Sequence, residues 1–273
     1  TALELIKSFK NQRSSHTFPV GPQHCAKELL TKILDLDDTG TKLASSGSIV
    51  NLLSCPDPKC ASRVVDEPFS LIDLPLPPGG KTARVSLNLC LSTYFKPEKL
   101  KKFDCSSCSA RQEGQTTKRI ITHVDQGLII GLQRSRARGR KDNTAIDFPL
   151  RGLDISEISF PPITDKFDLH AVVLHRGNLA TQGHYTAACL DNSSQWLMFN
   201  DGNPVCPLSN TSAELSGNGE EYIFFYRRRL PVVSTLAPNP IHAGHSTIRH
   251  RAECDFDVDI DAEIEIEDAM RLG

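Results

Sequence analysis

The pattern of hydrophobic positions divides the chain into a helical start and a long strand-rich part. Residues 22–36 carry apolar side chains at helical spacing, and Pro22 suits the first turn of a helix. From about Ser48 the pattern becomes strand-like, and residues 86–100 return to a helical pattern. Beyond Cys108 the apolar segments are short and typical of strands, which predicts an α+β protein in which strands dominate. The segments that we expect to be strands there are 117–124, 128–133, 169–175, 185–190, 195–200 and 221–226.

One hairpin stands out because polar side chains mark both of its strands. His184 follows a glycine and opens an apolar strand; a tight Asn-Ser-Ser turn follows, and the second strand ends in Asn200 and Asp201. This layout can bring an imidazole next to an orienting side-chain oxygen across the hairpin. It is the base-and-orienter half of a cysteine-protease triad, in which one ring nitrogen faces a thiol and the other donates to a fixed acceptor. The alternative is that His184 is a buried histidine with satisfied hydrogen bonds.

Four cysteines form two pairs. Cys55 and Cys60 are separated by four residues, and Cys105 and Cys108 are separated by two, which is the spacing that lets two thiolates close on one zinc ion. We expect one structural Zn²⁺ held by all four thiolates, which would tie two distant hairpins together; the alternative is four free structural thiols. Three further cysteines lie in apolar or turn contexts and are expected to be packing residues: Cys90, Cys189 and Cys206.

Composition excludes several classes of protein. No apolar run approaches the roughly 18 residues of a membrane span, so no membrane partner is expected. The chain carries a net charge of −2, and eight acids without a base lie between Asp255 and Asp268. That leaves the rest at about +6, too weak and scattered to indicate nucleic-acid binding. The sequence does not start with a secretory signal, so we expect an intracellular protein, cytoplasmic and/or nuclear. Because the first residue is Thr1, we interpret the chain as a fragment whose N-terminus lies upstream.

Two charged segments lie outside the apolar pattern. The basic segment Arg134–Lys141 is expected to be a solvated loop, and a nuclear address is the alternative. Residues 230–273 are rich in Pro, Ser, Ala and His before they turn acidic, and we expect a mostly disordered tail. Acids alternate with apolar residues in its last part, so the alternative is a strand that adds to the sheet edge of a partner.

Taken in order, many segments resemble the ubiquitin-specific proteases, which are papain-like cysteine enzymes. Gln23-His24-Cys25-Ala26-Lys27-Glu28-Leu29-Leu30 is similar to the Gln-Gln-Asp-Ala-x-Glu-Phe-Leu helix of that family. Gly183-His184-Tyr185 with Trp196-x2-Phe199-Asn200-Asp201 resembles its histidine box. The resemblance runs from about Pro22 to Arg229. The other segments that carry it are 69–75, 86–91, 105–108, 117–120, 128–134, 148–154 and 221–228.

The resemblance implies the fold and the activity. It implies a papain-like cysteine protease fold of the ubiquitin-specific protease type, N-terminally truncated, within residues 1–229. A zinc-bearing β finger would occupy about 48–125 and a β-rich palm about 126–229, followed by the tail at 230–273. The activity would be hydrolysis at the C-terminal glycine of ubiquitin, and the partners would be ubiquitin or ubiquitinated proteins. His184 would be the general base, Asn200 would orient it and Asp201 would support the site.

The departures from the family concern the nucleophile. The Asn-x-Cys-Tyr/Trp box that carries the thiol in the family is missing, and Cys25 occupies the position of the helix Asp. Chain order would allow Cys25 to act with His184, but the match places it inside a later helix without an oxyanion loop. We therefore expect the nucleophile in a missing N-terminal segment and this chain alone to be inactive. The alternatives are a catalytically dead ubiquitin-binding pseudo-protease and a protease for another ubiquitin-like modifier.

Overall fold

The computed structural model describes residues 24–35, 46–55, 57, 59–60, 63–77, 84–100, 103–105, 108, 111–112, 115–215 and 219–229. All of them belong to one compact unit, Pro22–Arg229. The expectations for the tail at 230–273 and for the start of the chain lie outside the described residues. Among the described helices, none is long and apolar enough to cross a membrane.

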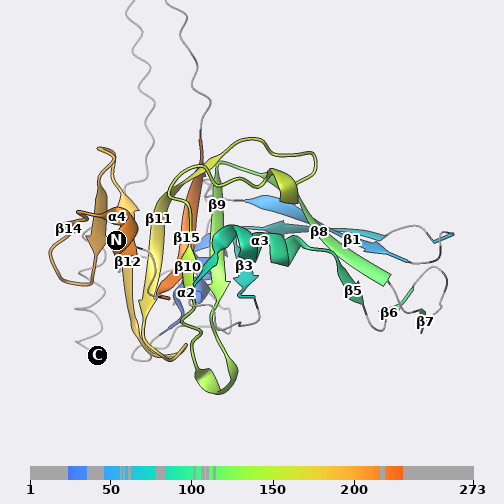
Figure 1. Ribbon diagram of the computed structural model, residues 1–273, viewed down its shortest axis with the longest axis horizontal. Helices are drawn as coiled ribbons and strands as arrows, with labels where there is room; N and C mark the ends of the chain where they lie inside the picture. Colours follow the sequence, from blue (N-terminus) through green and yellow to red (C-terminus); the bar gives the residue numbers. More distant parts are fainter. Residues whose placement is uncertain are drawn as a thin grey trace, which may run out of the picture. The chain divides into compact units, whose positions relative to one another are not determined.

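A seven-stranded sheet forms the centre of this unit, in the order β14-β13-β12-β11-β15-β9-β3. Its strands pair antiparallel, apart from the parallel pair of β3 and β9. Figure 1 shows β9, β15, β11 and β12 following one another across the sheet. The bounds of its strands are β3 Ile72–Pro75, β9 Gly127–Gln133, β11 Phe167–Arg176, β12 His184–Leu190, β13 Trp196–Phe199, β14 Cys206–Pro207 and β15 Glu221–Arg228.

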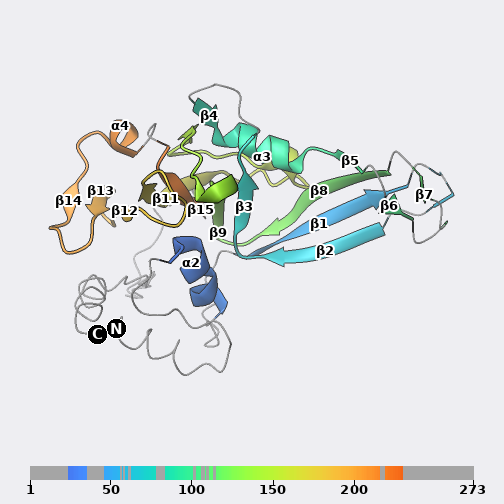
Figure 2. The ribbon, with the colours of Figure 1, turned by 90° about the horizontal axis from the view of Figure 1, so that it is seen from below.

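The side chains of this sheet enter two separate hydrophobic clusters. The larger cluster joins the sheet to α3 (Leu87–Phe95), and Leu132, Val172 and Phe224 are fully buried in it. The smaller cluster, around Ile223, receives the apolar side of α2 (Ala26–Asp35). Figure 2 shows α2 and α3 on either side of β3 and β9. Strands that alternate between two cores in this way are buried on both faces, which explains the near-continuous apolar sequence of β9.

A four-stranded sheet, in the order β2-β1-β8-β5, leads from the centre to the cysteine pairs. Figure 1 shows β1, β8 and β5 running away from α3 toward the short β6–β7 hairpin. The bounds of the remaining elements are β1 Gly47–Ser54, β2 Arg63–Phe69, β4 Arg84–Ser86, β5 Glu98–Leu100, β6 Phe103–Asp104, β7 Arg111–Gln112, β8 Gln115–Val124, η1 Ala137–Gly139, β10 Ala145–Asp147, η2 Ser156–Ile158 and α4 Thr211–Leu215.

The hydrophobic pattern predicted most of these elements correctly. The helix expected at 22–36 corresponds to α2, and the six strands expected beyond Cys108 correspond to β8, β9, β11, β12, β13 and β15. The helix expected at 86–100 is shorter than its pattern predicts. Ser86 caps it by accepting a hydrogen bond from the Leu89 N–H at 3.1 Å, and it ends at Phe95. Lys96 has an extended ψ of 138°, because the residue before a proline is disfavoured in the α region.

The basic segment Arg134–Lys141 is the solvated loop that its charge predicts only in its middle part. The side chains at its two ends are buried, with Arg134 1% exposed and Lys141 7% exposed. The middle of the segment, around η1, is largely exposed. Composition could not predict the burial of Arg134 and Lys141, because a buried cation needs hydrogen-bond acceptors from other elements, and the local sequence does not reveal them. Cys206 is likewise exposed rather than packed, whereas Cys90 is buried in the larger core as expected.

Candidate functional site

His184 occupies the first position of β12, and its side chain is 43% exposed. Ala187 of β12 pairs with Phe199 of β13, so Asn200, one position beyond Phe199, lies opposite Thr186. Residues two apart on a strand point to the same face, and so do residues directly opposite each other on neighbouring strands. This register therefore puts His184 and Asn200 on one face of the sheet.

The turn between β12 and β13 sets this register. The side chain of Asp191 accepts hydrogen bonds from the backbone N–H groups of Ser193 at 2.9 Å and Gln195 at 2.7 Å. Ser194 has a φ of 63°, which is in the left-handed region. An aspartate that bonds the backbone two residues on mimics a turn in its own side chain. The expected Asn-Ser-Ser turn is thus present and is closed by the residue before it.

The imidazole of His184 contacts both residues that follow β13. Its Nε2 lies 2.6 Å from Asn200 Oδ1, and its Nδ1 lies 3.5 Å from Asp201 Oδ2. An amide oxygen only accepts, so Nε2 donates in this contact and Nδ1 is left as the basic nitrogen. The Asp201 carboxylate can then stabilise a positive charge that develops on the ring.

The turn after β13 holds Asn200 in place. Asp201 has a φ of 47°, so the chain reverses in the left-handed region directly after Asn200. The carbonyl of Asn200 accepts from Asn203 twice, at 3.1 Å from its backbone N–H and at 2.7 Å from its side-chain amide. Asn203 was not among the residues predicted from the sequence. Its place at the end of an Asn-Asp-Gly-Asn turn was the signal that could have indicated it.

Cys25 lies on the other face of the sheet from His184. Tyr185 follows His184 in β12 and therefore points the opposite way, into the smaller cluster that also contains Cys25. The Cys25 Sγ lies 3.0 Å from the hydroxyl of Tyr222, and the ring centroids of Tyr185 and Tyr222 are 5.9 Å apart. The thiol is thus separated from the imidazole by the strand itself.

The four paired cysteines meet at the far end of the four-stranded sheet. The ligand atoms of Cys55, Cys60, Cys105 and Cys108 all lie within 4.8 Å of one another, so this cluster could hold a metal ion. The Sγ atoms of Cys55 and Cys108 are 4.0 Å apart, and two thiolates on one tetrahedral zinc are separated by about 3.8 Å. Hydrogen bonding to Cys108 and desolvation raise the pKa of the Cys60 thiol. Metal binding here must therefore displace thiol protons.

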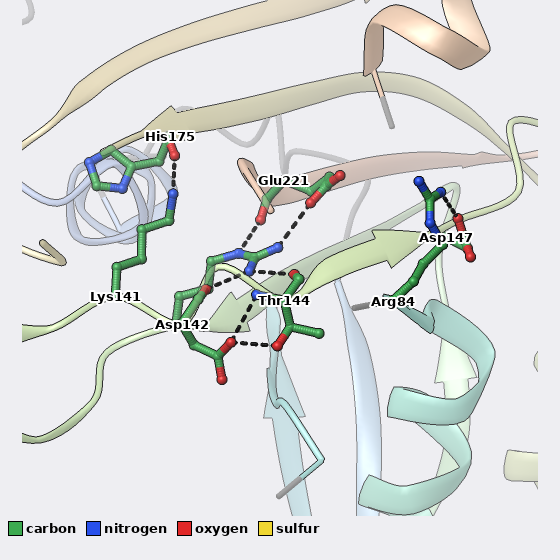
Figure 3. A network of polar contacts seen from close by, with 8 residues as sticks. Arg84, Lys141, Asp142, Thr144, Asp147, His175 and Glu221 are labelled. Carbon is green, nitrogen blue, oxygen red and sulfur yellow. Dashed lines mark hydrogen bonds and ion pairs between the residues drawn. The ribbon is translucent and has the colours of Figure 1, made fainter. Parts of the chain in front are cut away.

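A buried polar network next to β11 was missed by the sequence analysis. Figure 3 shows Asp142, Thr144 and Glu221 converging on one guanidinium, which belongs to Arg134, and the ammonium of Lys141 at the carbonyl of His175. The hydrophobic pattern does not distinguish these positions from ordinary surface or core residues.

Burial in this network lowers the pKa values of Arg134, Lys141 and His175. Burial lowers the pKa of Lys141 to about 8. Burial, together with the nearby charges of Lys141 and Arg134, lowers the pKa of His175 to about 4. His175 is therefore neutral at pH 7, and it cannot repel the two cations beside it.

Comparison with known proteins supports the resemblance seen in the sequence. The family model described as ubiquitin carboxyl-terminal hydrolase matches residues 3–226. Ubiquitin carboxyl-terminal hydrolase 2 of Gallus gallus is 30% identical over 214 residues, which cover 76% of this chain and 58% of that protein. The Homo sapiens protein of that name is 30% identical over 75% of this chain and 34% of its own length. Ubiquitin carboxyl-terminal hydrolase 21 of Rattus norvegicus is 30% identical over 66% of this chain and 32% of its length. The chain thus spans between about a third and 58% of these relatives.

Solved structures share the fold. The SAGA DUB module Ubp8/Sgf11/Sus1/Sgf73 bound to monoubiquitin matches with a TM-score of 0.63 and 24% identity, over 77% of this chain and 49% of the matched chain. A yeast SAGA DUB module matches with a TM-score of 0.60 and 25% identity, over 76% of this chain and 46% of the matched chain. These matches confirm the expected α+β fold of the ubiquitin-specific protease type.

Proposed function

We propose, because this chain belongs to the ubiquitin carboxyl-terminal hydrolase family, that it carries the histidine half of a thiol-dependent deubiquitinase site. The reaction would be hydrolysis of the isopeptide or peptide bond at the C-terminal glycine of ubiquitin. The observation that carries the proposal is the 2.6 Å contact between His184 Nε2 and Asn200 Oδ1 on a histidine that is 43% exposed. A partly open imidazole with one nitrogen held by an amide is the arrangement that a thiol needs from its base.

Each residue of the site has one task in this reaction. His184 Nδ1 takes the proton of the attacking thiol and returns it to the leaving amine, and in the second half it activates the water that cleaves the acyl-enzyme. Asn200 holds the ring by accepting from Nε2, and the turn around Asn203 holds Asn200. Asp201, whose carboxylate lies 3.5 Å from Nδ1, stabilises the imidazolium that forms between the two proton transfers.

The nucleophile in this proposal is a thiol other than Cys25. The Cys25 Sγ is engaged with the Tyr222 hydroxyl at 3.0 Å, in the cluster that Tyr185 enters on the face away from His184. A general base must come within hydrogen-bond reach of the proton that it removes, and a strand lies between these two groups. The proposal therefore excludes Cys25 as the nucleophile that His184 serves.

The metal of the cysteine cluster is proposed to be zinc. Four thiolates whose sulfur atoms lie within 4.8 Å of one another are a donor set that structural zinc sites use, and their softness disfavours calcium and magnesium. The ion would join the loop after β1, which carries Cys55, to the β6–β7 region, which carries Cys105 and Cys108. Its contribution would be structural, because protein ligands occupy all four positions of the tetrahedron.

The remaining assignments follow from this function. Ubiquitin or ubiquitinated proteins are the proposed partners, and a protein that acts on them is proposed to work inside the cell, in the cytoplasm and/or the nucleus. Residues 1–229 are proposed to form one partial catalytic domain, with its finger at about 48–125 and its palm at about 126–229. The acidic tail at 230–273 is proposed to be a separate, low-complexity segment.

The experiment that tests the function compares cleavage with binding. The protein is incubated with a fluorogenic ubiquitin substrate, and ubiquitin binding is measured by calorimetry in parallel. In the protein that holds the nucleophile, His184→Ala is expected to reduce kcat about 10²- to 10⁴-fold while ubiquitin still binds. Cys25→Ala serves as the matched control and should leave kcat close to that of the wild type.

Three outcomes would contradict parts of the proposal. Loss of cleavage in the Cys25→Ala protein would make Cys25 the nucleophile. Binding of ubiquitin with no cleavage, even when the upstream sequence is present, would identify a pseudo-protease. Binding of another ubiquitin-like modifier in preference to ubiquitin would change the substrate but keep the site.

A further inference from the structure

The buried side chain of Arg134 donates four hydrogen bonds. Its Nε donates to the Glu221 carbonyl at 2.6 Å, and one terminal nitrogen donates to the Glu221 carboxylate at 3.0 Å. The other terminal nitrogen donates to the carbonyls of Asp142 and Thr144, at 2.7 and 2.8 Å. Both Arg134 and Glu221 have side chains that are 1% exposed. Arg134 thus ties the end of β9 to the start of β15 and folds the segment 134–144 back on itself.

That folded segment in turn holds the turn 177–183, which precedes β12. The Lys141 N–H donates to the Asn178 carbonyl, and the Ala180 N–H donates to the Gly139 carbonyl, both at 2.9 Å. The side-chain amide of Asn143 donates to the side-chain oxygen of Asn178 at 3.0 Å. The turn is therefore braced through its backbone at two residues, and both contacts come from the segment that Arg134 folds.

Lys141 also holds the end of β11. Its ammonium donates to the His175 carbonyl, as Figure 3 shows. The next residue, Arg176, is the β11 residue that lies opposite His184. The Lys141 ammonium therefore contacts the residue directly before Arg176, and Arg176 is the strand position that pairs with His184.

The buried pair of Arg134 and Glu221 also fixes β11 through β15, the strand that pairs with β11 on the side away from β12. The register between β11 and β15 shifts between Val173 and Leu174, and Leu174 then faces Glu221. Such an irregularity leaves part of a ladder unpaired and bends the strand locally. Glu221 is held at this point by the guanidinium of Arg134. The part of β15 beside the irregularity is therefore fixed by the side chain of Arg134, the residue that follows β9.

We propose that Arg134 and Glu221 are positioning residues for His184, acting through the segment 134–144 and the turn 177–183. The inference rests on the proposed function of His184, and it adds a route by which two buried charges hold the base in register. The hydrogen bonds of Arg134 go to Glu221 and to residues 142 and 144, so the pair acts through the backbone rather than on the reacting atoms.

The energetics favour a positioning role over a stabilising one. A buried ion pair contributes little net stability, because the cost of removing two charges from water offsets most of their attraction. The pair instead fixes the geometry of its neighbours. The planar guanidinium group of an arginine donates hydrogen bonds at fixed angles, and an apolar pair of equal volume cannot do this. Replacing both charges together should therefore spare the fold and release the segment 134–144.

The test uses a double variant and a matched control, in the protein that holds the nucleophile. Arg134→Met with Glu221→Leu removes the buried pair without leaving one charge unpaired. Arg84→Met with Asp147→Leu removes an ion pair whose two side chains are each 49% exposed and which Figure 3 shows apart from the buried network.

Three readouts follow the proposed route. The first is hydrogen exchange of the Lys141 and Ala180 amides, which report on the contact between the segment and the turn. The second is the titration of the His184 ring, followed by NMR. The third is hydrolysis of the fluorogenic ubiquitin substrate, with kcat and KM measured separately.

In the buried double variant, we expect the Lys141 and Ala180 amides to exchange at least about 10-fold faster and the His184 titration to shift. We also expect kcat to fall about 10- to 100-fold with KM within about 2-fold. The control variant should match the wild type in all three readouts. Arg134→Lys keeps the positive charge but loses the planar guanidinium group. In this variant the Lys141 and Ala180 amides should exchange as fast as in the double variant.

A folded double variant with wild-type exchange and wild-type titration of His184 would overturn the proposal. If the double variant does not fold, Glu221→Gln carries the same test, because it keeps the volume and weakens the hydrogen bond from Arg134 by removing the charge of its acceptor. Failure of the proposed function gives a different result: His184→Ala would leave hydrolysis unchanged, while the exchange rates and the titration would still respond to the double variant.

Discussion

Two histidines lie in neighbouring strands of the sheet and have opposite surroundings. His184 is 43% exposed and is held by Asn200 at its Nε2, while its Nδ1 lies 3.5 Å from the carboxylate of Asp201. His175 is 2% exposed, and its ring stacks on Tyr185 at 4.5 Å between the centroids. The first environment suits a base that exchanges protons, and the second suits a neutral packing residue.

The side-chain amide of Asn200 is expected to orient the imidazole of His184 rather than to stabilise a positive charge on it. Asn200→Ala should lower kcat about 10- to 100-fold in the protein that holds the nucleophile, because the ring loses the acceptor at its Nε2. Asn200→Asp should retain more activity, since a carboxylate also accepts from Nε2. The measurement is the rate of hydrolysis of a fluorogenic ubiquitin substrate, with Asn192→Ala in the preceding turn as the control. Equal rates for wild type and Asn200→Ala would contradict this role.

The buried His175 is expected to make the protein less stable in mild acid. Its pKa is lowered to about 4 in the folded state, whereas the unperturbed value is 6.5. Between these two values the unfolded chain binds more protons than the folded one, so stability falls as the pH drops from 6.5 to 4. The loss of unfolding free energy from this residue should reach about 3 kcal/mol.

Urea unfolding at several pH values measures this effect. His175→Phe keeps a ring in the stack with Tyr185 and should flatten the dependence between pH 6.5 and 4. His123→Asn, which removes an exposed histidine, should leave the dependence unchanged. A dependence that is equally steep in both variants would show that other groups cause the acid sensitivity.

At the scale of elements, two hairpin regions carry most of the chemistry. The β12–β13 hairpin brings His184 and Asn200 onto one face, and its Asp191 turn sets the register by which they meet. The loop at the far end of β1 and the β6–β7 region bring the four paired cysteines together. In both cases a loop places the functional atoms, so their geometry depends on the turn more than on the strands.

The cysteine cluster is expected to bind one zinc ion and to lose it in acid. The ligands must be thiolates, so protons compete with the metal and affinity should fall as the pH falls. Chelation should increase amide exchange in β1 and β8 while leaving β9 and β11 protected, because β1 and β8 belong to the sheet that leads to the cluster and β9 and β11 do not.

Metal content by mass spectrometry and exchange with and without a chelator test this prediction. Cys105→Ser should reduce zinc below one ion per chain, and Cys206→Ser, which alters an exposed thiol outside the cluster, should not. One zinc per chain in both variants would contradict the assignment of these ligands.

At the scale of the whole unit, the seven-stranded sheet separates two layers. One face carries the larger core and, at its margin, His184; the other carries α2 with Cys25. Lys27 of α2 holds this second layer in place by bonding Asp73 at 2.7 Å and the Leu132 carbonyl at 3.0 Å. The helix that directly follows Cys25 therefore braces the sheet on the face away from the proposed base.

Ubiquitin is expected to stabilise the folded unit if the proposed function is correct. A ligand that binds only the folded state at a free concentration of about 100 times its Kd adds about 2.7 kcal/mol, which corresponds to a rise of about 5–10 °C in Tm for a domain of this size. Thermal unfolding with increasing ubiquitin measures the shift, and lysozyme at equal concentration is the control protein. A Tm that does not move with ubiquitin would contradict binding by this chain.

The sequence by itself determined most of the elements and the two groups of candidate functional residues. The alternation in the β12–β13 hairpin, with a recognisable turn between its strands, was enough to place His184 beside Asn200. The paired spacing of the cysteines predicted their meeting, which the structure shows within 4.8 Å. Both signals were local: a turn fixes the register of a hairpin, and short loops bring paired thiols together.

Only the tertiary structure decided which cations are buried and on which face each cysteine lies. Arg134 belongs to a segment that looks exposed and basic, yet its acceptors come from β15 and from residues 142 and 144, and only their convergence makes its burial possible. Cys25 precedes His184 in an order that would suit a catalytic pair, but α2 packs on the opposite face of the sheet. These outcomes depend on contacts between residues far apart in the chain, and the periodicity of one segment carries no information about them.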